Sequence, residues 1–193
     1  MKLNLNKLRN TLRTTLISVW EYVIPIWKIS GLFKSIKSKK DLENFIQERS
    51  AHVTQTTLYG YLKTRIGVKY IAMMEDERFL KSINLAKWNI YVVALADCTF
   101  YVFSYLISEK YLKDNDCKEI FLNILENEKK NGLSDEIFDR GIKNFLARID
   151  KVNFSNYHLN DPFKESGQAL YYWSPIADEL KSLDKKIVLN SIQ

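Results

Sequence analysis

The stretch that decides the fold is Trp88–Ile107, WNIYVVALADCTFYVFSYLI, the longest apolar run in the chain. Strands usually hold about 3–10 residues, so a run of this length predicts a helix. Its one formal charge is Asp97, near the centre. A helix that is apolar on nearly every side lies in the middle of a bundle or across a membrane. Ser82 is a suitable N-cap, which predicts a central helix over about 82–108.

The same run is long enough to cross a bilayer, with Trp88 and Tyr105 near the two interfaces, as in aromatic belts. Against a span, Asp97 at the centre would cost about 2.5–3.5 kcal/mol on insertion scales. Polar residues dilute the run, and the rest of the chain is polar. A buried helix in a folded domain is therefore favoured. A true span and an interfacial arrangement remain the alternatives.

Composition predicts an all-α fold, a single helical bundle around the central apolar helix. The chain has 193 residues, 46% of them hydrophobic, with only six Gly and three Pro, which favours helices over a turn-rich β fold. We expect residues 41–193 to form the helical domain. The two cysteines, Cys98 and Cys117, show neither a disulfide framework nor metal-ligand spacing. A reducing, cytoplasmic compartment therefore fits best.

Positive charge is concentrated at the N-terminus. Residues 1–40 hold nine basic side chains against Glu21 and carry a net charge of +8, whereas residues 41–193 sum to −2. Apolar residues at helical spacing over 3–29 predict an amphipathic helix broken at Pro25. Basic amphipathic helices with tryptophans are typical of membrane-surface anchors. The candidate membrane- or partner-binding residues are Lys7, Arg9, Arg13, Trp20, Trp27, Lys34, Lys37, Lys39 and Lys40.

Two other interpretations of this N-terminal arm stay open. Its apolar side could pack on the protein's own core, or the segment could direct targeting. A secretory signal is disfavoured, because Glu21 and Pro25 interrupt the apolar part and no small-residue cleavage site is present nearby.

Periodicity and capping residues predict the remaining helices. We expect them over 42–65, capped by Asp41 and ended by Gly67; over 69–80; from a turn at 113–116 through Lys130; from Ser134 to Ile149; and from Ser174-Pro175 to Leu189. Residues 151–173 read as a loop rich in aromatic side chains.

A dense polar face is predicted in the middle of the 42–65 helix, where Glu48, His52 and Gln55 follow at spacings of four and three. Asp97 must find a partner or become protonated, because burying an unpaired carboxylate is costly. The expected buried polar network consists of Arg49, His52, Gln55, Arg65 and Asp97. The functional alternative is a carboxylate–histidine acid–base site, with Glu48, His52 and Asp97 as candidate catalytic residues.

Other chemistries find little support in the sequence. No metal site is expected, because Glu-x-x-His pairs on facing helices are missing. No cofactor is expected either, since the chain has no glycine-rich phosphate loop. There is no G-x-S-x-G elbow around a nucleophile. Nucleic-acid binding is disfavoured, because the folded part is slightly acidic.

Three stretches resemble a small, largely uncharacterised alphaproteobacterial family, some members of which carry the label "esterase". They are QTTLYGYLKTRIGVKY (55–70), MMEDERFLKSINLAKW (73–88) and YWSPIADELKSLDKKIVLNSI (172–192). The resemblance covers most of residues 41–192 and implies a bacterial protein. It names no mechanism and transfers no catalytic residue. In that family the last segment continues further, which implies that this chain ends short of a final helix.

Three functions are hypotheses at this point. The favoured one is a non-enzymatic helical protein whose N-terminal arm binds the anionic surface of the inner membrane, from the cytoplasmic side, or a membrane-bound protein partner. The first alternative is a small esterase-like hydrolase with a polar site near His52 and Asp97. The second is an assembly or interaction factor that uses the aromatic loop 154–173. The sequence does not decide the oligomeric state.

Overall fold

The computed structural model describes residues 36–112 and 116–189, without the side chain of Ile187. The chain divides into two units, residues 1–37 and residues 38–193. The helix predicted over 3–29, and with it most of the N-terminal arm, lies outside the described residues. The elements of the fold belong to the second unit.

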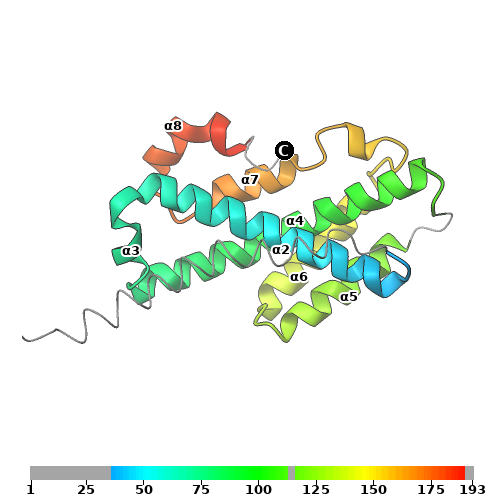
Figure 1. Cartoon of the computed structure of the whole chain (residues 1–193), viewed down its shortest axis with the longest axis horizontal. Helices are drawn as coiled ribbons and strands as arrows, with labels where there is room; N and C mark the ends of the chain where they lie inside the picture. Colours follow the sequence, from blue (N-terminus) through cyan, green and yellow to red (C-terminus); the bar gives the residue numbers. More distant parts are fainter. Residues whose placement is uncertain (1–35, 113–115, 190–193) are drawn as a thin grey trace, which may run out of the picture. The chain divides into compact units, whose positions relative to one another are not determined.

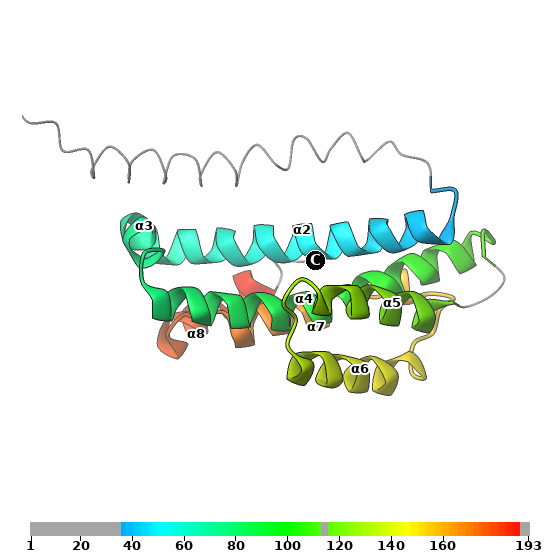
Figure 2. The same cartoon turned by 90° about the horizontal axis from the view of Figure 1, so that it is seen from below.

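Within the described ranges every regular element is a helix and none is a strand, which confirms the all-α prediction. The elements are α2 (Lys39–Ile66), η2 (Gly67–Lys69), α3 (Tyr70–Met73), α4 (Glu77–Ser108), α5 (Cys117–Lys129), α6 (Asp135–Ile149), η3 (Tyr157–Leu159), α7 (Lys164–Trp173) and α8 (Asp178–Leu189). The long helix α4 runs between α2 on one side and α6 on the other (Figures 1 and 2). It also packs against α5, η3 and α7. The expected bundle around one central helix is therefore present.

Helix α4 begins at Glu77, five residues before the predicted start at Ser82. Its N-cap is Asp76, whose carboxylate accepts hydrogen bonds from the backbone N–H groups of Arg78 and Phe79 at 2.8 and 3.0 Å. The Ser82 hydroxyl instead donates to the carbonyl of Phe79, inside the helix. The prediction of one helix over 69–80 is wrong, because α3 ends at Met73 and the Asp76 cap starts a new helix at Glu77.

Helix α2 also begins earlier than predicted. Its N-cap is Ser38, and Asp41 occupies the third helical position of a capping box, in which each side chain accepts from the other residue's backbone N–H. The helix ends at Gly67 as predicted. Gly67 has φ +60° and ψ −133°, a conformation that side chains with a Cβ rarely adopt.

The segment 151–173 is not wholly a loop, which corrects the prediction. It contains η3 and ends in helix α7. Ser174 closes α7, with its hydroxyl and its N–H both donating to the carbonyl of Leu170. Its extended backbone suits a residue that precedes proline. Helix α8 therefore starts at Asp178 and not at Ser174-Pro175.

Two hydrophobic clusters share α4. One joins its residues 88–103 to α5, α6 and the start of α2, and stacks the rings of Phe100, Phe121 and Phe145. The other joins the beginning of α4 to the end of α2, α7 and α8. Helix α4 is long and apolar enough to cross a membrane, but 72% of its most apolar window is buried within the fold. Its apolar surface is thus largely used by the protein's own core.

Two glycines allow close helix contacts. A Cβ built on Gly141 of α6 would lie 2.5 Å from Cγ1 of Val92 on α4. A Cβ on Gly167 of α7 would lie 2.4 Å from the backbone oxygen of Leu189, at the end of α8. Both positions bring two helices nearer than any residue with a side chain permits.

We expect Gly141→Ala to lower the free energy of unfolding by about 1–3 kcal/mol, because the added methyl overpacks the contact with Val92. The control is Gly60→Ala, on the exposed face of α2, where a new Cβ meets nothing within 4 Å. This control should raise the free energy of unfolding by about 0.5–1 kcal/mol, since alanine is the better helix former. Urea denaturation followed by circular dichroism measures both. Equal shifts in the two variants would contradict the close contact.

Candidate functional site

The buried carboxylate of Asp97 is where four elements meet. Asp97 lies on α4 and is 0% exposed. Its Oδ2 accepts hydrogen bonds from the hydroxyl and the backbone N–H of Ser166 on α7, at 2.6 and 2.9 Å. Its Oδ1 pairs with the guanidinium of Arg148, from the last turn of α6. The hydroxyl of Tyr157, on η3, lies 3.3 Å from the same oxygen.

Tyr157 completes this cluster by holding the segment that precedes α7. Its hydroxyl has one hydrogen and lies 2.7 Å from the carbonyl of Pro162, but 3.3 Å from Asp97. The shorter contact therefore receives the hydrogen. The hydroxyl oxygen accepts from Arg148 at 3.3 Å. Burial raises the pKa of Tyr157, so the phenol stays neutral.

The pKa values of the charged groups in this cluster reflect two opposing effects, burial and pairing with the opposite charge. Burial raises the pKa of Asp97, while Arg148 and the two donors of Ser166 act against that rise. Burial is the largest single influence on Arg148 and lowers its pKa, but the attraction to Asp97, the hydrogen bond with it and the nearby Tyr157 and Glu165 together outweigh burial, so the pKa of Arg148 rises. The guanidinium stays charged and supplies the partner that a buried carboxylate needs.

The partners predicted for Asp97 lie elsewhere, and this is a correction. The buried stripe of α2 follows Ile46, Ser50, Thr54 and Leu58, at spacings of four. Glu48, His52 and Gln55 lie outside this stripe and are exposed. The structure therefore brings neither Glu48 nor His52 to Asp97, and the proposed acid–base site is not assembled.

The two predicted arginines also have other contacts. Arg65 pairs with Asp184 on α8. Arg49 places its guanidinium 5.3 Å from the ring centre of Phe45, one turn earlier on α2. Neither one reaches Asp97, whose salt bridge is with Arg148.

Some of the predicted membrane-binding lysines belong to the folded unit. Lys39 and Lys40 lie in the first turn of α2. Lys39 pairs with Asp116 at 3.1 Å and with Glu119 at 2.6 Å, so it joins α2 to the start of α5. Lys40 pairs with Glu43 at 3.0 Å, within α2. Lys37 is exposed. The other candidates lie outside the described residues: Lys7, Arg9, Arg13, Trp20, Trp27 and Lys34.

A serine and a histidine meet two turns further along α4. The hydroxyl of Ser104 lies 2.8 Å from Nδ1 of His158 and accepts the backbone N–H of His158 at 3.1 Å. The arrangement lets Ser104 donate to the ring, as in an activated nucleophile. However, Ser104 is 0% exposed, so a substrate cannot reach it. The pair fastens η3 to α4.

A second buried carboxylate, Glu128 on α5, also joins helices. It accepts hydrogen bonds from Gln47 on α2 at 2.8 Å and from the hydroxyl of Tyr91 on α4 at 2.7 Å. Asn131 donates to its other oxygen at 2.8 Å. The sequence patterns did not predict this site, nor the roles of Arg148, Tyr157, Ser104 and Ser166. One signal was present, since Ser104 follows Asp97 by seven residues on the same face of α4.

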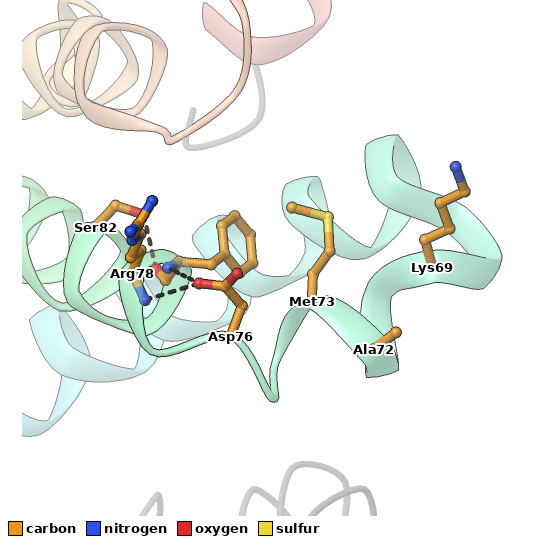
Figure 3. A pocket seen from close by; sticks show the side chains of 7 residues that line it. Lys69, Ala72, Met73, Asp76, Arg78 and Ser82 are labelled. Atoms are coloured by element: carbon orange, nitrogen blue, oxygen red, sulfur yellow. Dashed lines mark hydrogen bonds between the residues drawn. The ribbon is translucent and has the colours of Figure 1, made fainter.

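One hollow, of about 650 Å³, lies where α3 meets the start of α4. Figure 3 shows Met73 between Lys69 and the Asp76 cap, whose carboxylate is occupied by backbone N–H groups. Val68, on the neighbouring η2, is 99% exposed. This hollow is wide open, and it lies away from the buried polar cluster.

A smaller hollow, of about 190 Å³, lies between α2, α4 and the residue before α7. Its lining residues are Phe45, Arg49, Ser50, Val53, Ala94, Cys98, Tyr101, Val102 and Phe163. Burial raises the pKa of Cys98 to about 11, so its thiol stays protonated at neutral pH and is a poor nucleophile.

No cluster of His, Cys, Asp and Glu that could hold a metal ion occurs in the described ranges. Comparison of the chain with models of protein families, with curated proteins and with solved structures found no match. The resemblance carried by residues 55–70, 73–88 and 172–192 therefore stays a prediction.

We expect Arg148→Met to lower the free energy of unfolding by about 3–5 kcal/mol, because it leaves the Asp97 carboxylate buried without its charged partner. Adding Asp97→Asn should recover part of that loss. A double-mutant cycle by urea denaturation measures the coupling. Lys129→Met, which removes an exposed pair with Asp135 and a contact over the Phe138 ring, is the control and should lower the free energy of unfolding much less. Additive effects at Asp97 and Arg148 would contradict a shared buried pair.

Proposed function

We propose that the protein is a non-enzymatic helical protein held at an anionic membrane surface, the cytoplasmic face of the inner membrane, by its basic N-terminal residues. The observation that carries the proposal is the division of charge between the two units. Residues 1–37 hold seven basic side chains and one acidic one, whereas residues 38–193 hold 22 of each. The whole net charge of +6 thus belongs to the N-terminal unit.

The boundary at residue 37 places Lys39 and Lys40 in the folded unit, where they belong to α2 and pair with acidic residues. A neutral folded unit has little general attraction for an anionic surface. The N-terminal residues, in contrast, gain about 1 kcal/mol for each Lys or Arg near anionic lipid. Trp20 and Trp27 add side chains of the kind that favour the interface.

The polar clusters of the folded unit support a non-catalytic role. The carboxylate of Asp97 and the hydroxyl of Ser104 are fully buried and bonded to other elements of the same fold. His52 is exposed and apart from Asp97. The hydrolase alternative thereby loses the site that motivated it.

The aromatic segment 154–173 gives limited support to the interaction alternative. Most of its rings are half-buried, and several contact α4: Phe154 and Tyr157 pack on Phe100, and Phe163 packs on Tyr101. Tyr172 is exposed and has no such role in the core. These rings mainly build the fold.

We expect the variant Lys7→Gln, Arg9→Gln, Arg13→Gln and Lys34→Gln to bind phosphatidylserine-containing vesicles about a hundred- to a thousandfold more weakly than the parent, since four charges are lost. The measurement is cosedimentation of the full chain with vesicles, repeated at rising salt, which should weaken the parent's binding.

The matched control removes four charges from the folded unit: Lys81→Gln, Lys118→Gln, Lys185→Gln and Lys186→Gln, all exposed. It has the same net charge as the first variant and should bind within a few-fold of the parent. Equal losses of vesicle affinity in the two variants would show that only the net charge of the chain matters, and would contradict a specific role of the N-terminal residues. A parent that does not bind the vesicles would contradict the proposal and direct attention to a protein partner.

A further inference from the structure

We infer that the outward side of α8 is a dimerisation surface, on which two copies of this chain join their α8 helices in an antiparallel pair. The inference does not depend on the proposed membrane association, because every residue of the surface lies in the folded unit. It rests on three observations: the side chains that α8 buries, the leucines that it leaves exposed, and the charges beside those leucines.

Helix α8 turns charged side chains toward its own fold. It packs against α7 at the edge of the bundle (Figure 1). Its residues Lys181 and Asp184 are only 7% and 8% exposed. Asp184 pairs with Arg65 on α2, and the ammonium of Lys181 donates to the carbonyl of Tyr172 on α7 at 3.3 Å. Among the described side chains of α8, Val188 is the one buried apolar group. Polar contacts therefore hold much of this helix in place.

The leucines of α8 face solvent instead. Leu180 is 44% exposed and Leu183 is 77% exposed. They are three residues apart, so they are neighbours on one flank of the helix. A helix at the surface of a globular protein ordinarily buries its apolar stripe and exposes its charges. Here the charges of Lys181 and Asp184 are buried and the leucines are not, which is the arrangement expected of a surface that another molecule covers.

The charges beside the leucines indicate a second copy of the chain as the occupant. Glu179 and Lys186 are seven residues apart, so they lie on the same face of α8, next to the leucines. Both are exposed, and within residues 36–112 and 116–189 neither forms an ion pair. In an antiparallel pair, Leu180 of each copy meets Leu183 of the other, and Glu179 of each copy lies beside Lys186 of the other. The helix is thus complementary to a second, antiparallel α8.

An anionic membrane suits this surface less well. The exposed charged residues of α8 are two acids in its first turn, Asp178 and Glu179, and two lysines near its end, Lys185 and Lys186. Their charges cancel, and the acidic first turn would be repelled by anionic lipid. In an antiparallel pair the same acidic turn lies beside the basic turn of the other copy. The separation of charge along α8 therefore favours pairing with itself.

The test is sedimentation equilibrium of the full chain, without lipid, at rising protein concentration. We expect a monomer–dimer equilibrium with a Kd on the order of 100 μM, because two leucines per copy form a small interface. Leu180→Ser combined with Leu183→Ser should weaken dimerisation by at least about tenfold. The control, Leu85→Ser combined with Leu159→Ser, removes two exposed leucines from α4 and η3 and should leave dimerisation unchanged. A parent that stays monomeric up to about 1 mM, or equal dimerisation by the parent and the α8 variant, would overturn the inference.

Charge reversal tests the antiparallel arrangement. Glu179→Lys and Lys186→Glu should each weaken dimerisation by about three- to tenfold, because like charges then face each other in both symmetry-related contacts. A 1:1 mixture of the two variants should form a heterodimer about as tight as the parent dimer, since each contact again joins opposite charges. This mixture is also the folding control, because a heterodimer requires that both variants keep α8 intact. A mixture that dimerises no better than the separate variants would overturn the antiparallel pairing.

Discussion

The folded unit depends on the ion pair between Asp97 and Arg148. A carboxylate in the middle of an apolar helix is costly unless charge and hydrogen bonds compensate it. Here the compensation comes from α6 and α7 together, through Arg148 and both donors of Ser166. The consequence is geometric. Helices α6 and α7 must approach α4 at one level, and η3 must lie close enough to present Tyr157.

The surrounding packing accommodates that constraint. Gly141 lets α6 approach α4, and Gly167, next to Ser166, lets the end of α8 rest on α7. Elsewhere along α4, Glu128 binds Gln47 and Tyr91 and so fixes α2 and α5. The polar groups inside this protein thus join helices whose apolar surfaces alone would permit several registers.

The polar groups that stabilise the fold differ from the charged groups that remain available for binding. The buried carboxylates and the Ser104–His158 pair are occupied by the fold. The excess positive charge, in contrast, stands in the N-terminal unit. Membrane association would therefore use a different part of the chain from the buried polar clusters.

The sequence by itself determined the all-α class, the central position of the apolar run and the concentration of charge at the N-terminus, because composition and helical periodicity are local properties. It placed several helix starts wrongly, since Asp41 and Ser82 offer the same capping chemistry as Ser38 and Asp76, and only the observed hydrogen bonds distinguish them. The tertiary structure alone decided the partner of Asp97. Arg148 and Ser166 are 51 and 69 residues away in the chain. Periodicity tells which face of a helix is buried, but not which helix lies against it.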